Sequence, residues 1–137
     1  MARFLRDVRI SNVSINEDSI VQLSEVFAAR ARPLQEAAEA KGNEDGKPFL
    51  TFILRFDDKG YRIFSIDELL HHFRRAKDVE RLIITIETVA SLKTNRVIGD
   101  HLELKLDKKD ENNNLLSVTS DDSDWVDSSY SAVHEIL

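Results

Sequence analysis

The chain of 137 residues contains no cysteine. This absence excludes disulfide bonds, thiolate zinc sites and catalysis by a thiol nucleophile. It agrees with the reducing cytosol, so we expect a cytoplasmic protein. No segment approaches the roughly 20 consecutive apolar residues of a membrane-spanning helix. Charged residues, Arg6, Asp7 and Arg9, occupy the N-terminal positions where a signal peptide has its apolar stretch. A soluble protein without a membrane span is therefore expected.

Glycine is scarce and dispersed. The four glycines are too far apart to form a dinucleotide-binding or phosphate-binding loop. The nucleophile elbow of the α/β-hydrolases and the two-histidine zinc motif of metalloproteases are also missing. These absences exclude nucleotide binding through those loops and leave the chain without the familiar hydrolase signatures. No cofactor is expected.

The net charge of −6 is concentrated in the last 31 residues, which carry two basic and eight acidic side chains. The acidic C-terminal segment is unsuited to nonspecific binding of a phosphate backbone, which needs clustered lysine and arginine. Four of its aspartates lie close together, but their spacing fits no calcium-binding loop. We interpret them as caps of a final helix rather than as a metal site. These four are Asp121, Asp122, Asp124 and Asp127.

Alternation of apolar and polar residues predicts the strands. Leu102, Leu104 and Leu106 alternate with polar residues, which indicates a strand with one face in water. Residues 49–56 and 61–64 are both rich in β-prone residues, and a four-residue connection with Gly60 at positive φ is expected to join them as a hairpin. Further strands are predicted over residues 4–10, over 81–89 and around 116–118.

The first helix is predicted to begin near residue 17. Asn16 is a suitable cap, and Ser14 with Glu17 offers an alternative capping box one turn earlier. Pro33 is expected to kink this helix or to open a second helical segment, because proline lacks the N–H of the helical hydrogen bond.

Two further helices follow from local patterns. A capping box of Ser65 with Glu68 and a staple of Phe64 on Leu69 predict a helix that begins at Ile66. The last helix is predicted from apolar residues at helical spacing. Its expected apolar face consists of Val126, Tyr130, Val133 and Leu137, flanked by Trp125 and Ile136.

These elements predict one α+β domain over residues 1–137. Its expected core is a five- to six-stranded, mostly antiparallel sheet with about three helices packed on one face. The chain stops at Leu137, on the apolar face of the last helix. That ending is compatible with a domain excised from a longer protein, or with a helix end that packs on a partner.

The histidine pair His71-His72 raises the question of a metal or acid–base site. Adjacent residues of a helix point about 100° apart, and both histidines lie off the predicted apolar stripe. We interpret the pair as part of a solvated helix surface, and we expect no metal ligand or catalytic residue here.

The candidate partner surface is the polar face of the sheet. Its mixed charge suits a specific protein partner better than a nucleic acid, although an ordinary solvated sheet face is the alternative. A slip of one residue in any strand would disperse the set. The residues expected to project together are Arg55, Arg62, Glu87, His101, Glu103 and Lys105.

The favoured function is a non-catalytic protein-interaction or regulatory module. Its partner would be an unidentified protein or the rest of a longer chain, and homo-oligomerisation stays open. One alternative is a small enzyme with a site built from Glu87, His101 and Glu103, which would require a pocket and perturbed pKa values. Another is a weak nucleic-acid binder with a salt-sensitive basic patch. That patch would consist of Arg3, Arg6, Arg9, Arg30 and Arg32.

Overall fold

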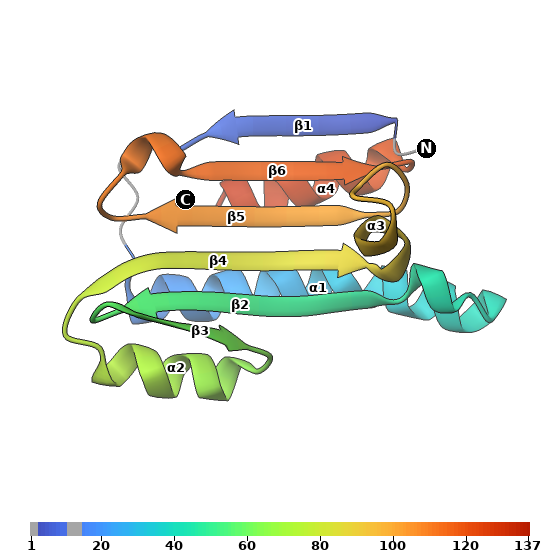
Figure 1. Cartoon of the computed structure of the whole chain (residues 1–137). Coiled ribbons are helices and arrows are strands. Elements are labelled where there is room, and N and C mark those ends of the chain that lie inside the picture. The colour runs from blue at the N-terminus through green and yellow to red at the C-terminus, as the bar shows by residue number, and fades with distance from the viewer. Residues whose placement is uncertain (1–2, 11–14) are drawn as a thin grey trace.

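A computed structural model describes residues 3–10 and 15–137. Its centre is one six-stranded antiparallel sheet with the spatial order β1-β6-β5-β4-β2-β3 (Figure 1). This confirms the predicted α+β class and the predicted size of the sheet. The strands are β1 (Phe4–Arg9), β2 (Pro48–Phe56), β3 (Lys59–Ile63), β4 (Val79–Thr88), β5 (His101–Asp107) and β6 (Leu115–Ser120). The helices are α1 (Glu17–Lys41), α2 (Ile66–Arg75), α3 (Val89–Lys93) and α4 (Ser123–His134).

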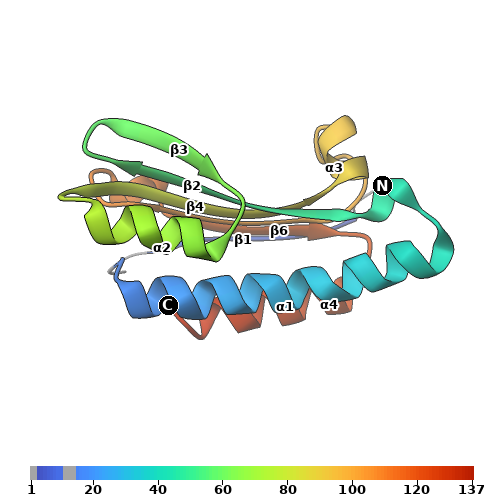
Figure 2. The ribbon, with the colours of Figure 1, turned by 90° about the horizontal axis from the view of Figure 1, so that it is seen from below.

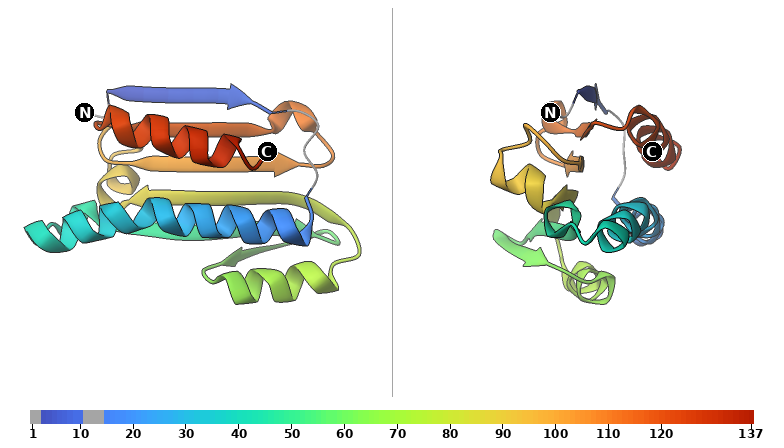
Figure 3. Two further views of the ribbon diagram at one scale, coloured as in Figure 1. Left: turned by 180° about the vertical axis from the view of Figure 1, so that it is seen from behind. Right: turned by 90° about the vertical axis from the view of Figure 1, so that its right-hand side faces the viewer.

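The helices divide the sheet into a covered and an open face. Figures 2 and 3 show α1, α2 and α4 in one layer beneath the sheet, as predicted, whereas the short helix α3 lies against the opposite face. Within the described residues, the open face is therefore free of helices except at the end where α3 sits.

No helix within the described part of the chain is long and apolar enough to cross a membrane.

Strand register explains which residues form the core. Phe52, Ile84 and Leu104 stand side by side on β2, β4 and β5, and each is at most 2% exposed. Because side chains alternate across a strand, the even-numbered residues of β2, of β5 and of β4 from Arg81 onward face the helices, and the odd-numbered residues there face the open side. From the helix layer, α1 contributes Ile20 and Phe27 to the same core.

Helix α1 runs without interruption through Pro33, so the predicted second helical segment does not form. Asn16 is the N-cap, as predicted, and its side chain accepts a hydrogen bond from the backbone N–H of Ser19 at 2.9 Å. The alternative box begins at Ser14, which lies outside the described residues. Proline removes one hydrogen bond from a helix interior, and the packing of Ile20 and Phe27 on the sheet offsets that loss.

The hairpin between β2 and β3 closes differently from the prediction. Its turn has two residues, Asp57 and Asp58, with φ of 49° and 61°, while Gly60 belongs to β3 and has no positive φ. A two-residue hairpin turn of this kind needs left-handed backbone at both central positions, which aspartate tolerates. The carboxylate of Asp57 also accepts the backbone N–H groups of Lys77 and Asp78, at 3.2 and 2.8 Å.

Replacement of Gly60 by alanine is expected to raise the free energy of unfolding by about 0.5 kcal/mol, because alanine restricts the unfolded chain. A Cβ at this position meets no atom within 4 Å. Denaturant-induced unfolding of the two proteins measures the difference. A loss of more than about 1 kcal/mol would instead mean that Gly60 adopts the left-handed conformation.

Candidate partner surface

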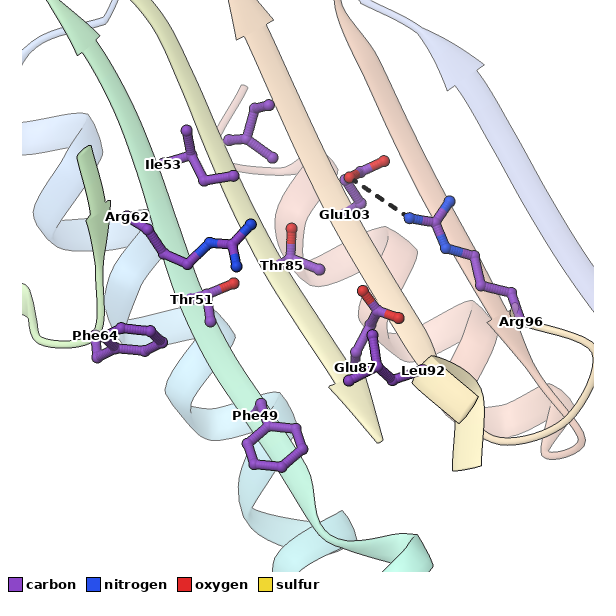
Figure 4. A pocket seen from close by; sticks show the side chains of 11 residues that line it. Phe49, Thr51, Ile53, Arg62, Phe64, Thr85, Glu87, Leu92, Arg96 and Glu103 are labelled. Atoms are coloured by element: carbon purple, nitrogen blue, oxygen red, sulfur yellow. Dashed lines mark ion pairs between the residues drawn. The ribbon is translucent and has the colours of Figure 1, made fainter. Parts of the chain in front are cut away.

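A groove of about 430 Å³ lies on the open face, across β2, β4 and β5 (Figure 4). Its floor includes Thr51 and Thr85, which are paired across β2 and β4. The end of β3 and the residue after it bound one side, while α3 and the loop that follows bound the other. A concave site therefore exists where sequence patterns indicated only a polar sheet face.

Register places all six predicted surface residues at open-face positions, but the structure brings only three of them into the groove. Arg62, Glu87 and Glu103 line it. Lys105 lies one pair further along β5, opposite Ile83. The two remaining residues, Arg55 and His101, lie outside the groove for different reasons.

Arg55 belongs to a separate network of charges at the far end of the sheet. Its Nε donates to Glu80 Oε2 at 2.8 Å, and Glu80 also accepts the backbone N–H of Asp58 at 3.1 Å. These hydrogen bonds lower the pKa of Glu80. A register shift between Arg55 and Phe56 leaves Glu80 as the extra residue of a β-bulge, which re-aims its side chain. The guanidinium of Arg55 is thus already occupied.

A second ion pair completes this network. Arg81 donates from Nε and Nη2 to Asp107 Oδ2, at 3.1 and 3.0 Å. Burial raises the pKa of Asp107, but the backbone N–H of Asp110 and the Arg81 guanidinium outweigh it, so the pKa is lowered overall. Charges at this end satisfy one another and serve the fold.

His101 is buried, contrary to the prediction that it projects into water. Only 1% of the residue is exposed, and neither ring nitrogen has a hydrogen-bond partner among the described residues. Figures 1 and 2 show the cause: α3 and its loop lie over the end of β4 and the start of β5. Burial, with a smaller effect from Arg96, lowers the His101 pKa to about 4. The predicted catalytic set of Glu87, His101 and Glu103 therefore does not converge in the groove.

The charges that do line the groove are incompletely paired. Arg96 Nη2 lies 4.0 Å from Glu103 Oε1. Within the described residues, Arg62 and Glu87 form no ion pair. Figure 4 shows Arg62 extending from the edge of the sheet toward Thr85. One cation and one anion thus remain available to a bound molecule.

Exposed apolar side chains surround these charges. Phe64 is 69% exposed, Leu92 63% and Phe49 49%. Sequence reasoning assigned Phe64 to a staple on Leu69, but its ring is largely in solvent. The N-cap of α2 is also simpler than predicted: Ser65 Oγ accepts the N–H of Glu68 at 3.2 Å, whereas the Glu68 side chain lies toward His72. Sequence patterns do not reveal this rim of Phe49, Phe64 and Leu92, because the exposure of a side chain depends on the fold.

The histidine and aspartate clusters considered as metal sites have structural roles. The ring of His72 stacks on Tyr61 with centroids 4.8 Å apart. Asp122 caps α4, accepting the N–H groups of Asp124 and Trp125 at 3.0 and 3.4 Å. No group of three or more potential ligands within residues 3–10 and 15–137 could hold a metal ion.

Three of the N-terminal arginines have partners within the protein. Arg6 lies over the ring of Tyr130, 3.7 Å from its centroid, and its Nη1 is 3.4 Å from Asp127 Oδ1. Arg30 donates to Ser128 Oγ at 2.9 Å, and Arg9 to the backbone oxygen of Asn112 at 3.4 Å. Two of these arginines therefore contact the acidic C-terminal helix, whose negative charge opposes a phosphate backbone.

Comparison of the chain with known protein families, with curated protein sequences and with solved structures found no match.

Proposed function

We propose that this chain is a non-catalytic protein-interaction or regulatory module that holds a partner protein on the open face of its sheet. The observation that carries the proposal is the groove, where the unpaired charges of Arg62 and Glu87 lie within a rim of exposed Phe49, Phe64 and Leu92. A compartment without disulfide chemistry, such as the cytoplasm, suits a cysteine-free chain.

The composition of this surface supports a protein partner. Binding energy at protein interfaces is concentrated in a few aromatic and arginine side chains near the centre of the contact. Charges on the partner that complement Arg62 and Glu87 would supply specificity and fix its orientation. Phe49, Phe64 and Leu92 add exposed apolar area, which is common at such surfaces.

Substitution of Arg62 by alanine is expected to weaken binding of the natural partner at least tenfold, the ordinary loss at an interface hot spot. Glu103→Ala should weaken binding less, because the Glu103 carboxylate already lies 4.0 Å from Arg96 Nη2 and is less available to a partner. Affinity capture from extract of the protein's own cells, with quantification of bound proteins, measures both.

Arg75→Ala is the matched control. Arg75 is an exposed arginine on α2, away from the open face, and its removal should leave capture unchanged. Thermal unfolding of each variant checks that the fold is intact. Equal capture by the intact chain and by Arg62→Ala would overturn the proposal.

A further inference from the structure

One edge of the sheet is only half covered. β3 pairs with β2 from Phe52 to Phe56, whereas β4 pairs with β2 from Pro48 to Phe56. The segment from Pro48 to Thr51 therefore has a neighbouring strand on one side alone (Figure 1). The chain leaves β3 at Phe64 and turns into α2 instead of continuing along this segment.

The unpaired backbone N–H at this edge belongs to Leu50. Phe56 and Lys59 flank the two-residue turn, so they form a hydrogen-bonded pair. Hydrogen-bonded pairs alternate along an antiparallel ladder, so every second residue of β2 before Phe56 also points its N–H and C=O toward the β3 side. Leu50 is on that alternation, beyond the end of β3. No turn, loop or side-chain hydrogen bond reaches its backbone within the described residues.

Hollows flank the same edge on both faces of the sheet. The open-face groove lies on one side, and an apolar groove of about 350 Å³ lies on the helix side, between β2, α1 and α2. Leu50 and Ile66 line the helix-side groove, and Phe64 lines both grooves. An extended chain beside Leu50 would direct alternate side chains into the two grooves.

We infer that the partner is an extended peptide segment that adds to β2 as an extra strand at Leu50, with an apolar side chain toward the helix-side groove and a carboxylate toward Arg62. This inference rests on the proposed function and gives the partner its chemistry. The free N–H and C=O of Leu50 select an extended backbone, the apolar groove selects an aliphatic residue, and unpaired Arg62 selects an acidic one. The other sheet edge, β1, carries Arg6, Asp7 and Arg9, charges that discourage strand addition.

Hydrogen exchange of backbone amides tests the free edge directly. In the unbound protein the Leu50 amide should exchange at least tenfold faster than the amides of Phe52 and Leu54, which face β3. A fluorescein-labelled heptapeptide of alternating valine and aspartate, with blocked ends, is the probe. Its binding should slow exchange at Leu50 at least tenfold. A Leu50 amide that is already protected in the free protein, or no change with saturating peptide, would overturn the inference.

Peptide chemistry provides a matched control that leaves the protein unaltered. In an added strand, residues with side chains toward the helix layer pair with Leu50, so N-methylation of the valine amides should weaken binding at least tenfold, while N-methylation of the aspartate amides should not. Replacement of aspartate by lysine should also weaken binding at least tenfold, through Arg62. Equal affinity for both N-methylated peptides, or for the lysine peptide, would overturn the inference.

A pair of variants separates this inference from the proposed function. Leu50→Pro removes the outward N–H, whereas Leu50→Ala keeps it and loses only side-chain contacts. The natural partner and the peptide should both bind at least tenfold more weakly to Leu50→Pro than to Leu50→Ala. If Arg62→Ala weakens partner capture but Leu50→Pro and Leu50→Ala capture the partner equally, the strand-addition inference is wrong and the proposed function stands. If Arg62→Ala leaves partner capture unchanged, the proposed function itself is wrong.

Discussion

Acidification from pH 7 to pH 4 is expected to lower the free energy of unfolding by about 3 kcal/mol through His101 alone. The unfolded chain binds a proton at this imidazole near its ordinary pKa of 6.5, whereas the folded protein binds it only near pH 4. Between these values the unfolded state carries more protons, so stability falls as the pH falls. Denaturant unfolding at intervals from pH 7 to 4 measures the slope.

Leucine at position 101 should abolish this dependence, because an aliphatic side chain fills a similar space and has no nitrogen to protonate. At pH 7 His101→Leu should be at least as stable as the parent, since it removes two buried polar atoms that lack partners among the described residues. His71→Leu, at an exposed histidine of α2, should retain the parent's slope. A parent curve that is flat between pH 6.5 and 4.5 would contradict the assignment.

The two carboxylates with lowered pKa values titrate at a lower pH than His101. Glu80 and Asp107 have lowered pKa values, so the stability they provide is lost only as the pH falls below their ordinary values of 4.5 and 3.8. Asp100 acts in the opposite direction, because burial raises its pKa despite the hydroxyl of Ser120 that donates to it. The slope between pH 6.5 and 4.5 therefore belongs mainly to His101.

The sheet and its two faces followed from the sequence because the side-chain period is strict. Leu102, Leu104 and Leu106 fix which face of β5 is buried, and antiparallel pairing then carries that choice to β4 and β2. For this reason the six predicted surface residues do share one face. The existence of a groove did not follow, because its walls depend on where β3 ends and where α3 packs.

Sequence patterns did not predict three short-range features of the structure. Helix α3 has five residues, too few for helical periodicity, and its position buries His101. The bulge at Arg55 changes the partner of that arginine through one unpaired residue, Glu80. The tight turn uses two aspartates in left-handed conformation, although glycine is the residue that sequence reasoning favours there. Each is decided by tertiary packing rather than by local preference.

Replacement of Gly99 by alanine is expected to destabilise the protein by about 3 kcal/mol, from the left-handed strain of a Cβ and from overpacking together. Gly99 has φ of +86°, and a Cβ there would lie 2.4 Å from Thr88 Oγ1 and 2.8 Å from the backbone nitrogen of Ser91. Thr88 Oγ1 caps α3 by accepting the N–H of Ser91 at 3.2 Å, and it also accepts the N–H of Asp100 at 3.1 Å. The methyl group must therefore displace the cap or the loop.

Displacement of α3 would also uncover His101, so the two effects are coupled. Gly99→Ala should lose part of the stability change between pH 6.5 and 4, because a hydrated imidazole regains a pKa closer to its ordinary value. Gly60→Ala is the matched control, with no atom near the added methyl group and no expected change in slope. Denaturant unfolding at pH 7 and pH 4.5, with NMR titration of His101, measures both effects. A Gly99→Ala protein as stable as the parent would show that the loop yields without cost and that α3 does not depend on the contact between Gly99 and Thr88.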